Sequence, residues 1–192
     1  MTMRLTSALA GTLLLAGLGL SAPASAGSDG AVSSIPVDGA TQLEMHLNAD
    51  CVAAEGKCFF NTRANLLTPN GPVALPGDTW ARQTITLRSM DRNVWQEAEY
   101  SAPAGTPRTT KGANHDNVLS KMYRSLNNVE ISITYFGGGS LERFSVDGHS
   151  VPTDWNTGRP ATGADFIACS TIHVVYGGVN LTSPNACAHT GF

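Results

Sequence analysis

Residues 79–90 read Thr-Trp-Ala-Arg-Gln-Thr-Ile-Thr-Leu-Arg-Ser-Met, and the character of their side chains alternates along the stretch. One set consists of Trp80, Arg82, Thr84, Thr86 and Arg88, and the other of Ala81, Gln83, Ile85, Leu87 and Ser89. Because successive side chains of a β-strand point to opposite faces, this period of two predicts a half-buried strand.

Similar stretches recur along the chain and are separated by residues that favour turns. They are residues 41–48, 58–66, 93–100, 128–136, 141–146, 165–176 and 179–181. Gly137-Gly138-Gly139 is expected to turn a hairpin between two of them, and Asp147-Gly148 to form the next tight turn. Eight to ten short strands predict an all-β fold, an antiparallel β-sandwich that is immunoglobulin-like in style.

One segment has helical rather than strand character. Over residues 116–126, Val118, Leu119, Met122 and Leu126 share a helical face that Asp116 could cap. The sandwich is therefore expected to contain at most one short helix. Residues 101–117 and 152–163 are rich in turn-forming residues and are expected to be surface loops.

The N-terminus has the parts of a secretory signal peptide. Arg4 precedes an apolar run from Ala8 to Leu20, and Ala24-Ser25-Ala26 forms a small-residue cleavage site. The run of 13 residues is shorter than the roughly 20 that cross a bilayer. We therefore predict a signal peptide over residues 1–26, an N-terminal arm over 27–40 and a single sandwich domain over 41–192.

Composition limits the partners of the mature chain. Removal of Arg4 with the signal peptide leaves 11 basic and 15 acidic residues, a formal charge of −4. The basic residues are dispersed, which argues against nucleic-acid binding. No second apolar stretch of membrane length follows, so we expect no membrane span and a secreted or envelope-associated protein.

The four cysteines predict two disulfides. An even number of cysteines in an exported chain favours disulfides over metal ligands, although three pairings are possible. We favour Cys51–Cys58 and Cys169–Cys187, since each pair is close in sequence. The first would close a turn, and the second would fasten the C-terminal tail to the strand over 165–176.

No motif in the sequence predicts a cofactor, a metal site or a defined catalytic centre. The five histidines, at positions 46, 115, 149, 173 and 189, lack the spacing of known metal motifs, and no Gly-x-Ser-x-Gly is present. If one of them is catalytic, His115 and His149 are favoured, because both are expected in loops. A small hydrolase using a His–carboxylate pair is the alternative that this leaves open.

The most distinctive binding candidate is Trp155 in the predicted loop 152–163. An exposed indole could stack on a sugar ring, with Asp154 and Asn156 as hydrogen-bond partners. The competing interpretation is a tryptophan that folds down over one end of the sandwich core.

Several short stretches resemble those of small exported proteins of actinobacteria, mycobacteria especially. They are Asn48-Ala49-Asp50-Cys51, Lys57-Cys58, Trp80-Ala81-Arg82-Gln83, Tyr135-Phe136-Gly137-Gly138-Gly139, Asp154-Trp155 and residues 175–184. The resemblance implies origin and export and adds no activity or site.

These observations favour a non-catalytic function. The leading hypothesis is a secreted module that binds an envelope or extracellular ligand, either carbohydrate or protein. The alternatives are the hydrolase and an interaction protein that self-associates through an edge strand. A fold class alone does not choose among them.

Overall fold

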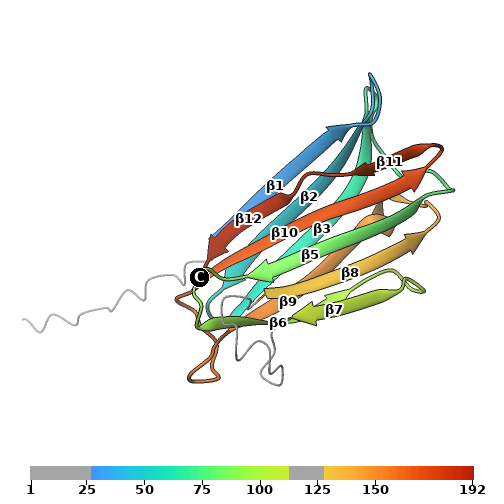
Figure 1. Ribbon diagram of the computed structural model, residues 1–192. Coiled ribbons are helices and arrows are strands. Elements are labelled where there is room, and N and C mark those ends of the chain that lie inside the picture. The colour runs from blue at the N-terminus through green and yellow to red at the C-terminus, as the bar shows by residue number, and fades with distance from the viewer. Residues whose placement is uncertain (1–26, 113–127) are drawn as a thin grey trace, which may run out of the picture.

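The protein is a β-sandwich in a computed structural model that describes residues 27–112 and 128–192 (Figure 1). The described residues form strands and one 3-10 helix, and no α-helix. The strands are β1 Gly27–Pro36, β2 Gln42–Val52, β3 Lys57–Thr68, β4 Gly71–Val73, β5 Trp80–Arg88, β6 Val94–Ser101, β7 Arg108–Gly112, β8 Asn128–Phe136, β9 Ser145–Asp154, β10 Asp165–Tyr176, β11 Val179–Thr182 and β12 Ala186–Gly191.

The strands form two antiparallel sheets. Sheet A has the order β1-β2-β3-β9-β6, with β4 also paired to β3; sheet B has the order β11-β10-β5-β8-β7, with β12 also paired to β10. The predicted all-β sandwich is confirmed. The helix predicted over 116–126 lies outside the described residues, and within the described ranges no helix is long and apolar enough for a membrane crossing.

The core follows from the alternation in the sequence. On β5, Ala81, Gln83, Ile85 and Leu87 are buried, whereas Arg82 and Arg88 are exposed. The inner faces of β2 and β8 alternate in the same way and contribute Leu43, Met45, Leu47, Val129, Ile131, Ile133 and Tyr135. Burial of one face therefore fixes which way each strand is turned.

Both predicted disulfides are present, and each joins directly opposed residues of neighbouring strands. Cys51 of β2 is opposite Cys58 of β3, with their Cα atoms 4.0 Å apart. Cys169 of β10 is opposite Cys187 of β12, at 4.1 Å. The bonds therefore link strands within a sheet and do not connect the two sheets.

The segment predicted as an N-terminal arm is largely a strand. Gly27–Pro36 forms β1 and pairs with β2 along its whole length. The small, polar composition of this segment fits its partly exposed position at the edge of sheet A. The composition suggested a loose arm, but hydrogen bonding to β2 holds the segment as a strand. Gly27 also lies against β12, where a Cβ atom would be 2.3 Å from the carbonyl oxygen of Gly191.

The segment after β8 differs from the expected hairpin. Gly137-Gly138-Gly139 and the 3-10 helix Leu141–Phe144 carry the chain from sheet B to sheet A, where β9 begins. The fully buried Phe144 packs its ring 4.9 Å from that of Tyr135. Burial of Phe144 between the sheets stabilises this crossing in place of a hairpin.

Asp147-Gly148 is also not a turn but part of β9. At Gly148, a Cβ atom would be 2.4 Å from the Phe60 ring and 2.6 Å from the carbonyl oxygen of Glu99. The glycine is thus explained by close packing inside the sheet, and the loop predicted over 152–163 begins only after Asp154.

The long sides of the sandwich are closed by contacts between edge strands. β1 and β12 lie side by side (Figure 1), and the Ser33 hydroxyl donates to the Pro184 carbonyl at 2.7 Å. On the opposite side, the Tyr100 hydroxyl of β6 lies 2.8 Å from Thr110 Oγ1 of β7. The two outer faces remain as the broad surfaces of the molecule.

A polar network crosses the otherwise apolar core. The Gln83 amide donates to Thr62 Oγ1 at 2.6 Å and to Ser170 Oγ at 3.4 Å. Its carbonyl oxygen accepts from the Tyr135 hydroxyl at 2.9 Å. Burial raises the pKa of Tyr135 far above its ordinary value, so the phenol stays a donor. The network joins β5, β8 and β10 of sheet B to β3 of sheet A.

Replacing Gln83 should therefore destabilise the whole sandwich. Gln83→Leu leaves several buried hydroxyls without their partner, which we expect to lower the free energy of unfolding by about 2–4 kcal/mol. Gln96→Leu is the matched control, because buried Gln96 has one hydrogen bond, from Ser150, and an Nε2 atom without a partner. Urea denaturation of both variants tests this, and equal losses would contradict the role given to the network.

Candidate ligand-binding surface

The predicted loop candidate forms an ordered turn at the end of β9. Asp154 Oδ1 accepts hydrogen bonds from the backbone N–H groups of Thr157 at 2.7 Å and Asn156 at 3.0 Å. The Thr157 bonds, together with that of Asn156, hold the pKa of Asp154 below its ordinary value. The Asp154 carboxylate therefore stabilises the turn that follows β9. The side chain of Asn156 is exposed.

Trp155 is half-buried and lies against Trp95. The two ring centroids are 6.0 Å apart with the rings nearly perpendicular, and the backbone N–H of Trp155 donates to the Asn93 carbonyl at 2.7 Å. Trp95 is only 3% exposed. Trp155 therefore helps to cover one end of the sandwich, and the ligand-binding role of residues 154–156 stays a prediction.

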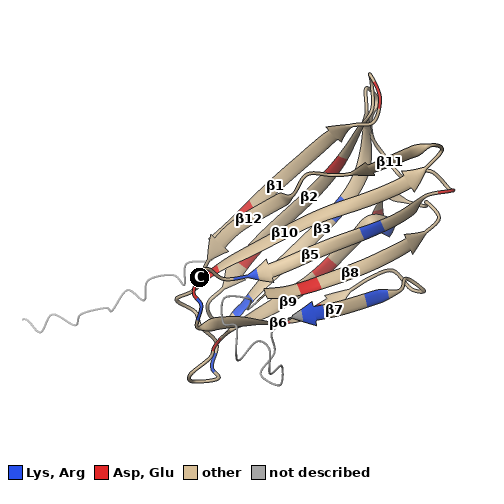
Figure 2. Ribbon diagram, viewed as in Figure 1, with Lys and Arg blue, Asp and Glu red and all other residues tan. Residues whose placement is uncertain are grey.

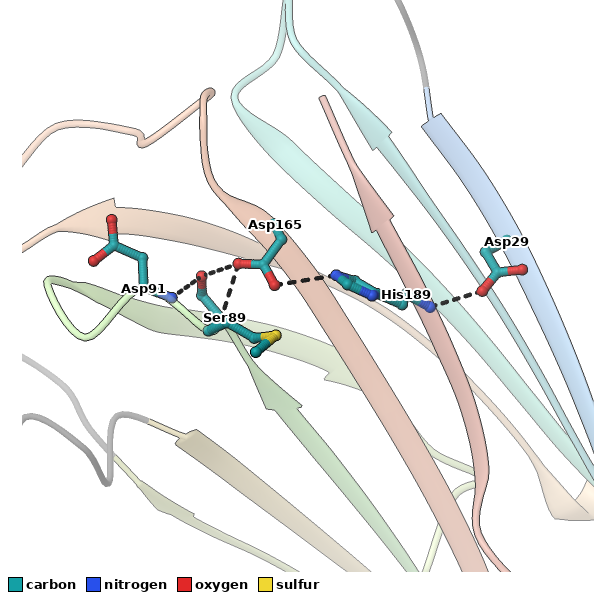
Figure 3. A network of polar contacts seen from close by, with 6 residues as sticks. Asp29, Ser89, Asp91, Asp165 and His189 are labelled. Atoms are coloured by element: carbon teal, nitrogen blue, oxygen red, sulfur yellow. Dashed lines mark hydrogen bonds and ion pairs between the residues drawn. The ribbon is translucent and has the colours of Figure 1, made fainter.

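Among the described histidines, His189 on β12 has the most polar contacts (Figure 3). His189 Nε2 lies 3.1 Å from Asp165 Oδ2, and its backbone N–H donates to Asp29 at 2.7 Å. Asp165 Oδ1 accepts from the Ser89 hydroxyl at 2.6 Å and from the Met90 N–H at 3.0 Å. Burial alone would raise the pKa of Asp165, but these hydrogen bonds outweigh it and lower the pKa.

Ser89, Asp165 and His189 are thus connected by hydrogen bonds, but their spatial arrangement differs from that of a catalytic triad. In a hydrolytic triad the imidazole contacts the serine hydroxyl and removes its proton. Here the Asp165 carboxylate lies between Ser89 and His189 and accepts from the serine (Figure 3). The arrangement is a structural clamp that ties β12 to β1 and β10, and it does not activate Ser89.

The other histidines lie on strands or outside the described residues. His46 Nε2 is 3.2 Å from Glu44 Oε2, and His149 Nε2 is 3.9 Å from Glu99 Oε2. His149 lies within β9, contrary to the expected loop, because that strand continues to Asp154. His115 is outside the described residues, among which no group of three His, Cys, Asp or Glu side chains could hold a metal.

Three exposed or half-exposed apolar side chains lie next to one another on the outer face of sheet B. Val175 of β10 is directly opposite Trp80 of β5, and Trp80 is directly opposite Phe136 of β8. Phe136 is 63% exposed and Val175 is 36% exposed. We call Val175, Trp80 and Phe136 the aromatic row.

The aromatic row is held in place by its neighbours. The Trp80 ring contacts that of His173 edge-on at 5.4 Å, and His173 Nε2 lies 2.8 Å from Asn180 Oδ1. The backbone carbonyl of Phe136 accepts from the Arg143 guanidinium at 2.7 Å. The exposed rings therefore belong to a rigid part of the sheet.

Polar groups border the aromatic row on both sides. The next row toward the middle of the sheet consists of His173, Arg82 and Thr134, which are opposite one another on β10, β5 and β8. Beyond the aromatic row, the exposed Asp78 accepts the N–H of Gly177 at 3.1 Å. Acidic and basic residues are dispersed over the strands of both sheets (Figure 2).

Sequence reasoning identified the strands of this surface but missed the surface itself. On β8 the core-facing residues are Val129, Ile131, Ile133 and Tyr135. Phe136 follows directly after Tyr135, so the alternation places this large apolar side chain on the solvent-facing side of the strand. An apolar residue at a solvent-facing position is the sequence feature that could have indicated the surface. The pairing of β5 with both β8 and β10, which brings the three side chains together, is not visible in the sequence.

Comparisons with known proteins add no family. No family model matches this chain, and no curated protein matches it. The interpretation of the surface therefore rests on the residues and their geometry.

The lowered pKa of Asp165 predicts a pH dependence of stability. A carboxyl whose pKa is lower in the folded state stabilises the fold above its unfolded pKa, about 3.8, and this contribution is lost as the pH falls through the folded value. Asp165→Asn should therefore reduce the loss of unfolding free energy between pH about 4 and about 2. Urea denaturation across this range tests it, with Asp50→Asn on the other sheet as control; an unchanged pH slope in Asp165→Asn would contradict the clamp.

Proposed function

We propose that this protein is an exported, non-catalytic binding module that acts at the cell envelope or outside the cell. The observation that carries the proposal is the aromatic row, an exposed apolar strip on the outer face of sheet B. Contiguous exposed apolar surface on a folded domain commonly marks a binding site. Aromatic side chains with polar groups around them are typical of such contacts.

The position of the first strand supports export. The Ala24-Ser25-Ala26 site directly precedes Gly27, the first residue of β1, so cleavage after Ala26 would remove no residue of the described strands. Two disulfides are consistent with an oxidising compartment. By a chain-entropy argument they contribute about 2.5 and about 3 kcal/mol.

The contacts of the histidines support binding rather than hydrolysis. Among the described histidines, His189 has the shortest contact with a carboxylate, but it shares Asp165 with Ser89 and belongs to the clamp between β1, β10 and β12. The aromatic row carries no such pair, since the partner of His173 is the Asn180 amide.

Export predicts a defined mature N-terminus. Expressed in a secreting host, the protein recovered from the medium should begin at Gly27, as measured by intact mass and N-terminal sequencing. Ala26→Arg should block processing, because the cleavage site requires a small residue there, whereas Ser25→Leu should be tolerated at the variable position. Medium protein that retains residues 1–26 would contradict the export proposal.

The binding surface can be located by amide chemical-shift mapping. The mature protein is titrated with a neutral glucan oligomer, a uronate oligomer, an acidic peptide and a basic peptide. A binder should shift amides around Val175, Trp80 and Phe136 on β10, β5 and β8, and Phe136→Ala should abolish those shifts. Phe59→Ala on the outer face of sheet A is the control.

Two results of that titration would overturn the proposal. One is a set of shifts confined to the outer face of sheet A or to the loop after Asp154. The other is the absence of shifts with every ligand of the panel.

A further inference from the structure

We infer that the aromatic row binds an extended, neutral polysaccharide whose sugar rings lie across β10, β5 and β8. This inference rests on the proposed function and names its ligand class. It follows from the spacing of the row, the polar groups beside it and the charge around it.

The spacing fits a chain of flat sugar rings. Val175, Trp80 and Phe136 are direct partners on adjacent strands, so neighbouring side chains are separated by about 4.8 Å. This step is comparable to one hexose unit in an extended polysaccharide. A chain crossing the strands would thus place successive sugar rings above Val175, Trp80 and Phe136. The C–H groups of a sugar can pack against the apolar surface of all three side chains and against the aromatic rings of Trp80 and Phe136.

The polar groups beside the row offer both donors and acceptors to sugar hydroxyls. Arg82, adjacent to Trp80 on the same strand face, presents guanidinium N–H groups and forms no ion pair with a described residue. On the other side, Asp78 has one carboxylate oxygen on Gly177, so its second oxygen can accept from a sugar. Asn180, opposite Val175, retains its amide N–H groups when its oxygen accepts from His173.

The charge around the row favours a neutral ligand. Arg82 and Asp78 flank it with opposite charges. The Arg143 guanidinium also lies at the end of the row, where it donates to the backbone carbonyls of Phe136 and Gly137, and the other neighbours are hydroxyl, amide and imidazole groups. The next outward-facing charge on β5 is Arg88, six residues or about 20 Å along the strand from Arg82. A uronate chain carries a carboxylate on every ring, and the cations beside the row, Arg82 and Arg143, are opposed by the Asp78 carboxylate.

The position of the row further selects the shape of the polysaccharide. The row lies on consecutive strands of one sheet, so its three side chains point out of the same face, together with the outward hydroxyls of Thr84, Thr171 and Ser132. A ribbon-like β-1,4-linked glucan can keep several rings in contact with such a face. A helical α-1,4-linked glucan of the same composition cannot, because its rings turn away from the surface.

The test compares cellohexaose with maltohexaose, which have equal mass, composition and charge but different shapes. Isothermal titration should show cellohexaose binding at least about tenfold more tightly than maltohexaose or a galacturonate hexamer. Trp80→Ala and Phe136→Ala should each weaken cellohexaose binding by about tenfold or more, as truncation of a central aromatic contact does. Arg82→Gln should weaken it several-fold, with Arg88→Gln on the same strand face as the matched control.

The outcomes separate this inference from the proposed function. Equal or tighter binding of the uronate, or of a peptide, at the aromatic row would overturn the neutral polysaccharide while leaving the binding module in place. Cellohexaose binding that is unchanged in Phe136→Ala would overturn the assignment of the row to this ligand. Thermal unfolding of each variant excludes misfolding, and Phe136→Ser provides a second, more polar truncation if Phe136→Ala aggregates.

Discussion

The buried amide of Gln83 is the interaction on which the rest of the sandwich depends. It is fully buried, and its hydrogen bonds involve Thr62 on sheet A and Tyr135 and Ser170 on sheet B. A buried amide is costly unless it is satisfied, so only one register of these strands is compatible with a stable core. Apolar contacts alone would tolerate small displacements of one sheet along the other, whereas such displacements would break the hydrogen bonds of Gln83.

The parts of the fold that sequence predicts are those governed by local alternation. β2, β3, β5, β6, β8 and β10 begin within two residues of their expected starts, since their buried faces repeat every second residue. The errors come from packing at a distance. Gly148 looked like a turn, yet it is needed because the Phe60 ring occupies the space above β9. The expected hairpin after β8 becomes a crossing because Phe144 is buried between the sheets.

The candidate surface was harder to predict for the same reason. Trp155, an aromatic residue in a predicted polar loop, was the most distinctive binding candidate in the sequence, but its ring packs on Trp95. The aromatic row consists of residues from three strands that are far apart in sequence, and only their direct pairing makes them neighbours. The sequence shows that Trp80 and Phe136 are out of phase with a buried face; it does not show that they are adjacent to each other and to Val175.

The core network and the aromatic row are two consequences of one register. Gln83 and Trp80 lie on opposite faces of β5, and a shift of β5 by one residue would exchange those faces. A shift by two would keep Trp80 outside but place it opposite Thr134 instead of Phe136, because β8 alternates in the same phase. The hydrogen bonds of Gln83 oppose both shifts, since Tyr135, its partner on β8, immediately precedes Phe136. The core amide therefore pre-organises the outer surface, and rigidity of this kind favours binding because little order has to be gained when a ligand arrives.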